Sequence, residues 1–206
     1  IEVIYCAASE NFKPLKSEEL KDFAKKTNLP KKFFLAVGTL EPRKNYPALL
    51  HAFYEFSKIY PDYHLVVVGG EGWQFQEVYD LVDYYNLRKK VHFLGYLSGK
   101  SLNGLYNLAT ALVFPSFYEG FGIPPLEAMR CGCPVIASKI ASIPEVLADS
   151  ALYVNPEKHK SIVNALDNLA KRSDLQKNLS LSGLKQAKNF SWEKSGKEFV
   201  RLFDQT

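Results

Sequence analysis

Two acidic residues, Glu119 and Glu127, bracket a glycine-containing turn that could bind an anionic ligand. Seven residues separate them, and Gly120 and Gly122 among these allow the backbone to turn tightly and approach a ligand closely. The apolar run at 111–114 just before the turn is typical of a buried strand. The pattern predicts a strand, a loop of bare N–H groups and a helix N-terminus, an arrangement that binds anions.

The helix after this turn can begin at the two prolines 124–125, because the first helical turn needs no backbone N–H from them. Two carboxylates beside the turn would repel an isolated phosphate. Ionised carboxylates do, however, accept hydrogen bonds from hydroxyl groups. The site therefore suits a phosphate whose other end carries hydroxyl groups.

A basic pair, Arg43 and Lys44, lies in the stretch 38–45, which reads GTLEPRKN. Arginine binds phosphate oxygens through two N–H groups at once, and lysine adds a point charge. Asn45 is expected to cap the following helix, and basic residues at a helix start oppose the helix dipole. A bound anion would remove that conflict. The alternative for two adjacent bases is a solvated loop.

Three further loops follow expected strands. The GGEG stretch at 69–72 matches neither the dinucleotide fingerprint nor the P-loop, so we expect a tight turn, with the backbone at Gly70 near a phosphate. The stretch 95–97 alone is typical of the end of a strand. The stretch 138–145 is compatible with a plain loop or with a ligand contact through Ser138 or the backbone.

No metal is expected from the cysteines and histidines. Cys131 and Cys133 lack a second ligand pair and are interpreted as small buried side chains; three cysteines indicate a reducing compartment. The four histidines show no ligand spacing along the chain, which favours exposed or core positions. They are His51, His64, His92 and His159.

Short apolar runs alternate with amphipathic helical patterns along the chain, which predicts an α/β fold with a doubly wound, parallel, six-stranded, Rossmann-like sheet. Ligands of such a sheet gather beyond the carboxyl ends of its strands. The expected strands are 33–37, 64–69, 91–94, 111–114, 134–137 and 151–154. The expected helices are 17–26, 45–60, 73–86, 102–109, 124–129, 144–147, 162–170, 175–187 and 192–203.

Composition fits one globular domain over 1–206. Apolar residues make up 47% and charged residues 23% of the 206, and the net charge of +4 is spread along the chain, which argues against a nucleic-acid binder. No 18-residue apolar run and no signal-peptide pattern occur, so we expect no transmembrane helix and a cytoplasmic location. The abrupt start predicts an excised part of a longer protein, with a linker-like segment at 1–30 and a closing helix at 190–206. That helix either packs on a missing half or completes this domain's core.

Read in order, these motifs resemble the C-terminal, donor-binding half of a retaining GT-B glycosyltransferase, and in particular glycosyltransferase family 4. The most specific motif is YEGFGIPPLEAM, which FPS precedes and GCPVIAS and IPE follow. VGTLEPRKN and VHFLGYL agree with the family in order and spacing. The resemblance covers nearly the whole chain.

The resemblance implies roles for individual residues. Arg43 and Lys44 would bind the donor diphosphate and, with Glu119 facing the transferred sugar, would be catalytic. Glu127 would hold the ribose hydroxyls. The family often has arginine where this chain has Thr39, which leaves the division of work between the two cations open. The other residues expected to line the donor site are Gly38, Gly70, Tyr96 and Leu97 (the last two against the base), Gly120, Phe121, Gly122 and Ile123.

The implied function is sugar transfer, with retention, from a UDP- or GDP-sugar to a glycan or lipid-linked acceptor, without any further cofactor. The N-terminal acceptor domain would be missing here, so we expect the fragment alone to be inactive and its parent to be cytoplasmic or peripheral to a membrane. Two alternatives stay open: a sugar-nucleotide epimerase of the same architecture, and a non-catalytic nucleotide-sugar-binding module. A glycosidase also uses paired carboxylates, but the basic pair and the glycine turn argue against it.

Overall fold

A parallel sheet forms the centre of the computed structural model, which describes residues 2–97 and 99–204. Over these residues the sheet has six strands in the order β3-β2-β1-β4-β5-β6, and all the strand pairs are parallel. The predicted doubly wound, Rossmann-like sheet is therefore confirmed. The strands are β1 (Lys32–Val37), β2 (Tyr63–Val68), β3 (Val91–Phe93), β4 (Ala111–Phe114), β5 (Val135–Ser138) and β6 (Leu152–Val154).

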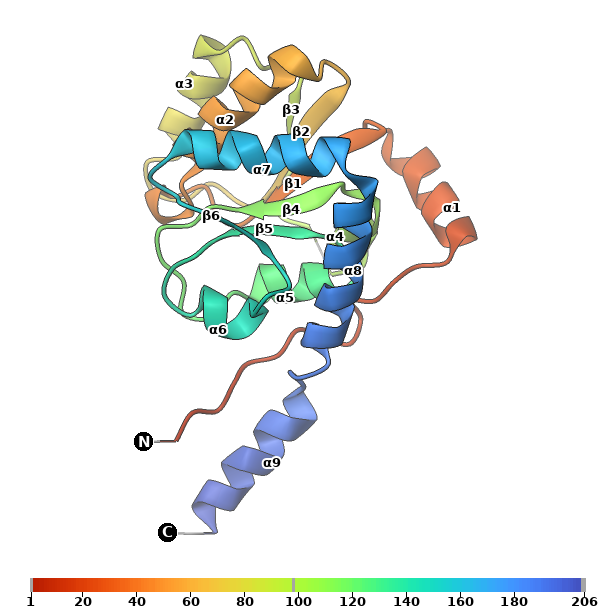
Figure 1. Cartoon of the computed structure of the whole chain (residues 1–206), viewed down its shortest axis with the longest axis vertical. Coiled ribbons are helices and arrows are strands. Elements are labelled where there is room, and N and C mark those ends of the chain that lie inside the picture. Colours follow the sequence, from red (N-terminus) through yellow and green to blue (C-terminus); the bar gives the residue numbers. More distant parts are fainter. Residues whose placement is uncertain (1, 98, 205–206) are drawn as a thin grey trace.

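Helices cover both faces of the sheet because alternate residues of each strand point to opposite faces. In β1, Phe33 and Leu35 belong to one apolar core and Phe34 and Ala36 to the other. The helices α2, α3 and α7 pack on the second of these faces, and α4, α5 and α6 on the first (Figure 1). The helical elements are α1 (Ser17–Thr27), the 3-10 turn η1 (Pro42–Lys44), α2 (Tyr46–Ile59), α3 (Gln76–Tyr84), α4 (Gly99–Leu108), α5 (Ile123–Arg130), α6 (Ile143–Leu147), α7 (His159–Lys171), α8 (Ser173–Ala187) and α9 (Trp192–Phe203).

The helix predicted over 73–86 is shorter at both ends than expected. Gln74 has φ of 57° and Asn86 has φ of 54°, both in the left-handed region, which a right-handed helix excludes. The helix therefore occupies only Gln76–Tyr84, and the side chain of Trp73 lies outside it, 62% exposed. No helix in the described part of the chain has the length and apolar character needed to cross a membrane.

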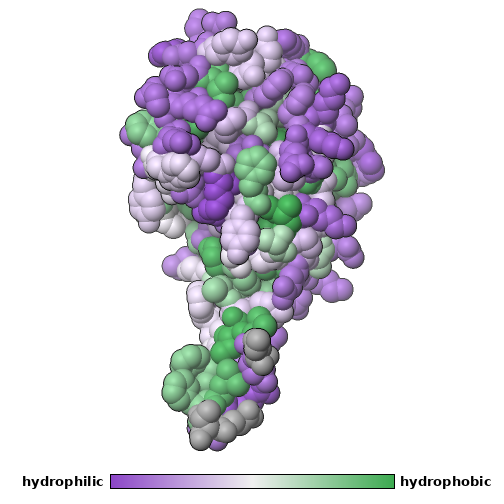
Figure 2. Space-filling model, turned by 90° about the vertical axis from the view of Figure 1, so that its left-hand side faces the viewer, coloured by the Kyte–Doolittle hydropathy of each residue, from purple (hydrophilic) through white to green (hydrophobic). Residues whose placement is uncertain are grey.

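The last helix, α9, projects from the rest of the domain (Figure 1). Its buried residue is Ser195, whose Oγ donates a hydrogen bond to the carbonyl of Tyr5 at 2.6 Å. Trp192 and Phe199 are 57% and 55% exposed, and apolar residues gather on the projecting part in Figure 2. Of the two interpretations of this helix, the one in which it completes the core of this domain is wrong. The ends of the predicted segments 1–30 and 190–206 include residues 1 and 205–206, which lie outside the described residues.

The loops after β1 and β2 touch through their backbones, and this contact tolerates no side chain at Gly69. A Cβ atom there would lie 2.0 Å from the carbonyl oxygen of Gly38, and the φ of 155° is already unfavourable for other residues. At the neighbouring Gly70, a Cβ atom would meet nothing within 4 Å. The fold therefore requires glycine at position 69, whereas position 70 has room for a side chain.

We predict that Gly69→Ala lowers the free energy of unfolding by about 2–4 kcal/mol, because the two loops must separate. The matched control Gly70→Ala should change it by less than about 1 kcal/mol. Urea unfolding followed by circular dichroism measures both values. Equal stability of the two variants would contradict the backbone contact.

Candidate functional site

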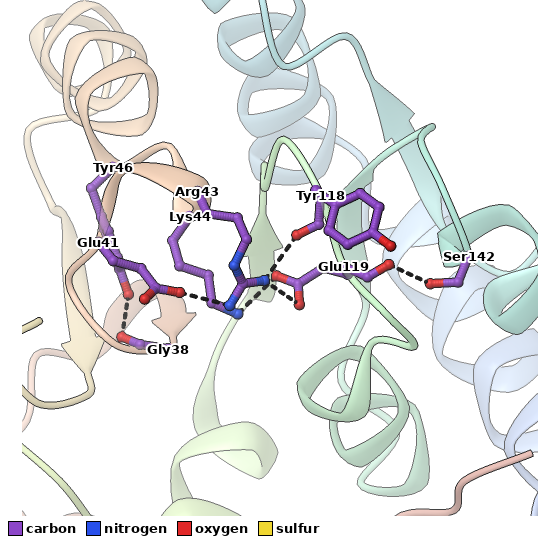
Figure 3. Close-up of polar contacts among 8 residues, drawn as sticks. All are labelled: Gly38, Glu41, Arg43, Lys44, Tyr46, Tyr118, Glu119 and Ser142. Carbon is purple, nitrogen blue, oxygen red and sulfur yellow. Dashed lines mark hydrogen bonds and ion pairs between the residues drawn. The ribbon is translucent and has the colours of Figure 1, made fainter. Parts of the chain in front are cut away.

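The carboxyl ends of β1, β2 and β4 bring three predicted loops to one edge of the sheet. These strands are neighbours in the order β2-β1-β4, so the segments 38–45, 69–72 and 115–123 leave the sheet side by side. Figure 3 shows the polar side chains that two of these loops direct toward one another. This edge is where ligands of parallel sheets are bound.

In the loop between β1 and α2, the side chain of Lys44 passes over Gly38, the first residue of the loop. A Cβ atom at Gly38 would lie 2.9 Å from Lys44 Cε, so glycine leaves the space through which the lysine side chain passes. The hydroxyl of Tyr46 donates to the carbonyl of Gly38 at 2.7 Å, and burial raises the pKa of that tyrosine. The hydrogen bond from Tyr46 thus joins the two ends of the loop. The ammonium group of Lys44 also lies 4.8 Å from the centre of the Phe114 ring, a cation–π contact.

Asn45 occupies the predicted N-cap position of α2, but the predicted capping bond is absent from the described residues. Its backbone is left-handed, with φ of 58°, and its side chain is buried. Nδ2 donates instead to the carbonyls of Pro115 at 3.1 Å and Pro156 at 2.8 Å. The predicted position at the start of the helix is therefore confirmed, but the side chain does not cap it and instead joins the ends of three segments far apart in sequence.

An ion-pair network joins the β1–α2 loop to the β4–α5 loop (Figure 3). The Glu119 carboxylate contacts Lys44 Nζ at 2.7 Å through one oxygen and Arg43 Nη1 at 2.8 Å through the other. Arg43 Nη2 lies 2.6 Å from Glu41 Oε1, and Nη1 also donates to the carbonyl of Tyr118 at 2.9 Å. The predicted cations and the predicted acid are therefore brought together at this edge.

The network carries no net charge, since two cations face two carboxylates. Glu119 is 8% exposed, and a carboxylate this buried requires charged partners to offset its desolvation. Arg43 is the more accessible cation, with a side chain 40% exposed against 11% for Lys44. An anion that binds here therefore has to compete with Glu119 for the same two cations.

The N-terminus of α5 offers backbone donors next to this network. Gly122 is the N-cap residue with φ of 105°, and a Cβ atom there would lie 2.7 Å from Ile143 Cδ1. In the hydrogen bonds of the described chain, the amide groups of residues 120–123 donate to no acceptor. The next two residues are prolines without an N–H. The anion-binding donors of this helix are therefore confined to residues 120–123.

Glu127 lies in the second turn of α5, and its Oε2 accepts a hydrogen bond from the hydroxyl of Tyr106 at 3.0 Å. Burial raises the pKa of the Glu127 carboxyl to about 7, and the bond from Tyr106 opposes this rise. The carboxyl therefore changes charge near neutral pH, and its ionised form is the one that accepts hydrogen bonds from ligand hydroxyls at both oxygens.

The GGEG stretch extends the contact between β1 and β2 beyond the strands. The N–H of Leu40 donates to the carbonyl of Gly70 at 2.9 Å, and the N–H of Gly72 donates to the carbonyl of Leu40 at 3.1 Å. Thr39, the residue before Leu40, is exposed. Glu71 forms a parallel bridge with Leu40, and the turn follows only at 73–75. The prediction of a tight turn at 69–72 is therefore wrong, whereas a phosphate contact at Gly70 stays a prediction.

The loop after β3 presents Tyr96 to solvent with 86% of its side chain exposed, while Leu97 is half-buried. The two residues lie at the same edge of the sheet as the network because β3 pairs with β2 in parallel. The predicted contact of both residues with a base stays a prediction.

Two residues of the network were not predicted. Glu41 pairs with Arg43, and its position two residues earlier in the same loop was an available signal. The hydroxyl of Ser142 donates to the carbonyl of Glu119 at 2.9 Å. No pattern in the sequence around Ser142 predicts this hydrogen bond. The nearby Ser138 hydroxyl is buried and has no hydrogen-bond partner among the described residues. Ser142 rather than Ser138 is thus the residue of that loop that supports the site.

Tertiary structure groups the histidines into two pairs that their spacing along the chain did not suggest. His64 Nδ1 lies 2.9 Å from His92 Nε2, and the rings of His51 and His159 stack with centroids 4.2 Å apart. The prediction of small buried cysteines is confirmed for Cys131 and Cys133, and Cys6 is exposed.

The sheet and the loops at its carboxyl edge define the C-terminal domain of a GT-B glycosyltransferase. A sequence model of the family "Glycosyl transferases group 1" matches residues 17–186. The chain therefore belongs to this family.

Curated relatives and a solved structure agree with this assignment. The chain is 36% identical over 175 residues to O-antigen chain mannosyltransferase B of Escherichia coli, covering 83% of this chain and 45% of that protein. It is 43% identical over 143 residues to O-antigen chain mannosyltransferase RfbU of Salmonella typhimurium, covering 69% and 39%. The C-terminal domain of the glycosyl transferase group 1 family protein LpcC from Francisella tularensis superposes with a TM-score of 0.78 at 26% identity, covering 89% of this chain and 97% of that domain. The chain spans less than half the length of these two curated relatives.

We predict that Glu127 makes stability fall as pH rises. Its pKa in the folded protein, about 7, lies above the ordinary value of 4.5, so the folded state holds the proton more tightly between these values. The free energy of unfolding should therefore drop by on the order of 2 kcal/mol between pH 5 and pH 8, relative to Glu127→Gln, which does not titrate. Urea unfolding at a series of pH values measures this difference.

A stability difference between Glu127→Gln and the parent chain that stays constant from pH 5 to pH 8 would contradict the raised pKa of Glu127.

Proposed function

We propose that this chain binds a nucleoside-diphosphate sugar and is the donor-binding half of a retaining glycosyltransferase. One observation carries the proposal: two cations and the unpaired amides of residues 120–123 converge on one edge of a parallel sheet, beside a buried carboxylate. A diphosphate matches this set, because Arg43 and Lys44 supply charge and the helix N-terminus supplies directed N–H groups.

Binding would exchange partners within the network. The diphosphate oxygens replace the Glu119 carboxylate as the partners of Lys44 and Arg43. Glu119 is then free to accept hydrogen bonds from hydroxyl groups of the sugar, which is attached to the diphosphate. Glu41 stays paired with Arg43 and holds the guanidinium group in place. The resting ion pairs thus keep the cations oriented before the donor arrives.

The bond that breaks in the proposed reaction joins the anomeric carbon to an oxygen of the diphosphate. The electron pair leaves with the diphosphate, so negative charge grows on the leaving group while the sugar becomes cationic. Lys44, Arg43 and the fixed amides stabilise the growing charge without reorganising. Retention of configuration is what membership of the retaining family implies for the new glycosidic bond.

The remaining contacts follow from the shape of the donor. Glu127 accepts hydrogen bonds from the ribose hydroxyls, since it lies one helical turn beyond the backbone amides of residues 120–123. The loop at Tyr96 and Leu97 contacts the base. Both mannosyltransferase names among the relatives favour mannose as the transferred sugar. The acceptor would bind to the part of the parent protein beyond this domain, and the exposed apolar face of α9 would pack there.

We predict that Lys44→Ala weakens binding of UDP or GDP by about 10- to 100-fold, because it removes one charge-assisted contact to the diphosphate. Isothermal titration calorimetry of the 206-residue chain measures the affinity. In the full-length enzyme, the same change should lower turnover by about two to three orders of magnitude.

The matched control is Lys58→Ala, which removes a lysine near the other end of α2, where Nζ lies over the Tyr54 ring. It should leave nucleotide affinity unchanged. Thermal unfolding of both variants separates a loss of binding from a loss of folding. Equal affinities for Lys44→Ala and the parent chain would remove Lys44 from the site.

We further predict that one class of nucleoside diphosphate raises the melting temperature more than the others. The panel contains UDP, GDP and ADP with their mannose and glucose derivatives, with orthophosphate and free mannose as controls. The chain alone should bind its donor without transferring the sugar to an acceptor. A change of the sugar without any acceptor would instead support an epimerase, and no shift with any nucleotide would refute the proposal.

A further inference from the structure

Three side chains on α2 and α7 form a cluster outside the donor site. His51 and Glu55 lie one turn apart on α2, and His159 is the first residue of α7. The two helices pack side by side on the same face of the sheet (Figure 1). The side chains of the cluster are 34–41% exposed, so an ion from solution can reach them.

The two distances from the carboxylate of this cluster are close to those between ligand atoms around a common metal ion. Glu55 Oε1 lies 3.5 Å from His51 Nε2 and 3.6 Å from His159 Nε2. Both distances are too long for hydrogen bonds. With metal–ligand bonds of about 2.0–2.1 Å, neighbouring ligand atoms of a tetrahedral zinc site are about 3.3 Å apart. The two distances from the carboxylate oxygen therefore exceed those of a zinc site by only a few tenths of an ångström, and a rotation of one imidazole ring would turn both nitrogens toward one ion.

We propose that His51, Glu55 and His159 form a binding site for a divalent transition metal, with Zn²⁺ as the best-fitting ion. Neutral imidazole nitrogens and one carboxylate oxygen are a ligand set that zinc accepts, with a fourth position left for water. One ligand atom from each of the three residues lies within 4.8 Å of the other two. The site differs from the donor site in its residues and in the charge of the ion it takes.

The alternative is a plain surface contact between the glutamate and the two histidines. The histidine rings stack, with centroids 4.2 Å apart and an angle of 11° between their planes. A metal ion bonds to an imidazole nitrogen in the plane of the ring, so one ion cannot lie in the planes of two stacked rings at once. Binding therefore requires at least one ring to turn out of the stack, which the partial exposure of both side chains allows.

The bound ion would tie the first turn of α7 to the middle of α2. The start of α2 is already tied to the segment before α7, because Asn45 donates to the carbonyl of Pro156. The ion would therefore reinforce the same pairing and stabilise the folded state by mass action. A rise in melting temperature is the expected consequence.

The test is a calorimetric titration of the 206-residue chain with ZnCl₂, in a Cys6→Ser background because Cys6 is an exposed thiol. We expect one equivalent to bind with a dissociation constant below about 10 µM. His159→Ala and Glu55→Gln should each weaken binding by at least about 10-fold, and the zinc-dependent rise in melting temperature should disappear.

The other histidine pair provides the matched control. The double variant His64→Ala/His92→Ala removes two histidines whose ring nitrogens lie 2.9 Å apart and that belong to no group of three potential metal ligands among the described residues. It should bind zinc as the parent chain does. Co²⁺ in place of Zn²⁺ should give the intense visible absorption of a four-coordinate site, and His159→Ala should lose it. Unchanged binding in His159→Ala, or loss of binding in the control, would overturn the proposal.

Discussion

The sharing of one buried carboxylate between two cations is the interaction on which this edge of the domain depends. Glu119 reaches across from the loop after β4 to Lys44 and Arg43 in the loop after β1. Parallel pairing of β1 with β4 brings these loops together although 75 positions separate the partners in sequence. Because a buried carboxylate without its cations would be strongly destabilising, the pairing fixes both loops. The same groups that organise this edge are those that the proposed donor would engage.

The backbone supports this network in ways that side-chain chemistry alone does not explain. Gly38 leaves room for the lysine side chain, and Gly122 adopts a left-handed conformation against Ile143. Ser142 holds the carbonyl of Glu119 from a third loop. Fixed positions of this kind matter for charge stabilisation, since groups that are already oriented need no rearrangement as charge develops.

The sequence predicted the sheet well because each buried strand is a continuous apolar run, and helical stripes separate the runs. It also predicted Arg43, Lys44 and Glu119 as one group, since all three follow strands that end at the same edge. It failed where a local pattern had two outcomes: asparagine before α2 is a typical cap, yet Asn45 bonds to distant carbonyls. The cluster of His51 and His159 was missed because its members lie 108 positions apart and only the packing of α2 on α7 unites them.

The contact between Gly38 and Gly69 has a consequence for how such a domain can diversify. Since no side chain fits at Gly69, the surface between the loops after β1 and β2 is formed by main-chain atoms. Its shape therefore does not depend on side chains at these two glycines. Outward-facing positions of the neighbouring loops, such as Thr39 and Tyr96, are not constrained in this way. Substitutions at these exposed positions could therefore alter which ligand the site accepts while the main-chain contact between Gly38 and Gly69 is kept.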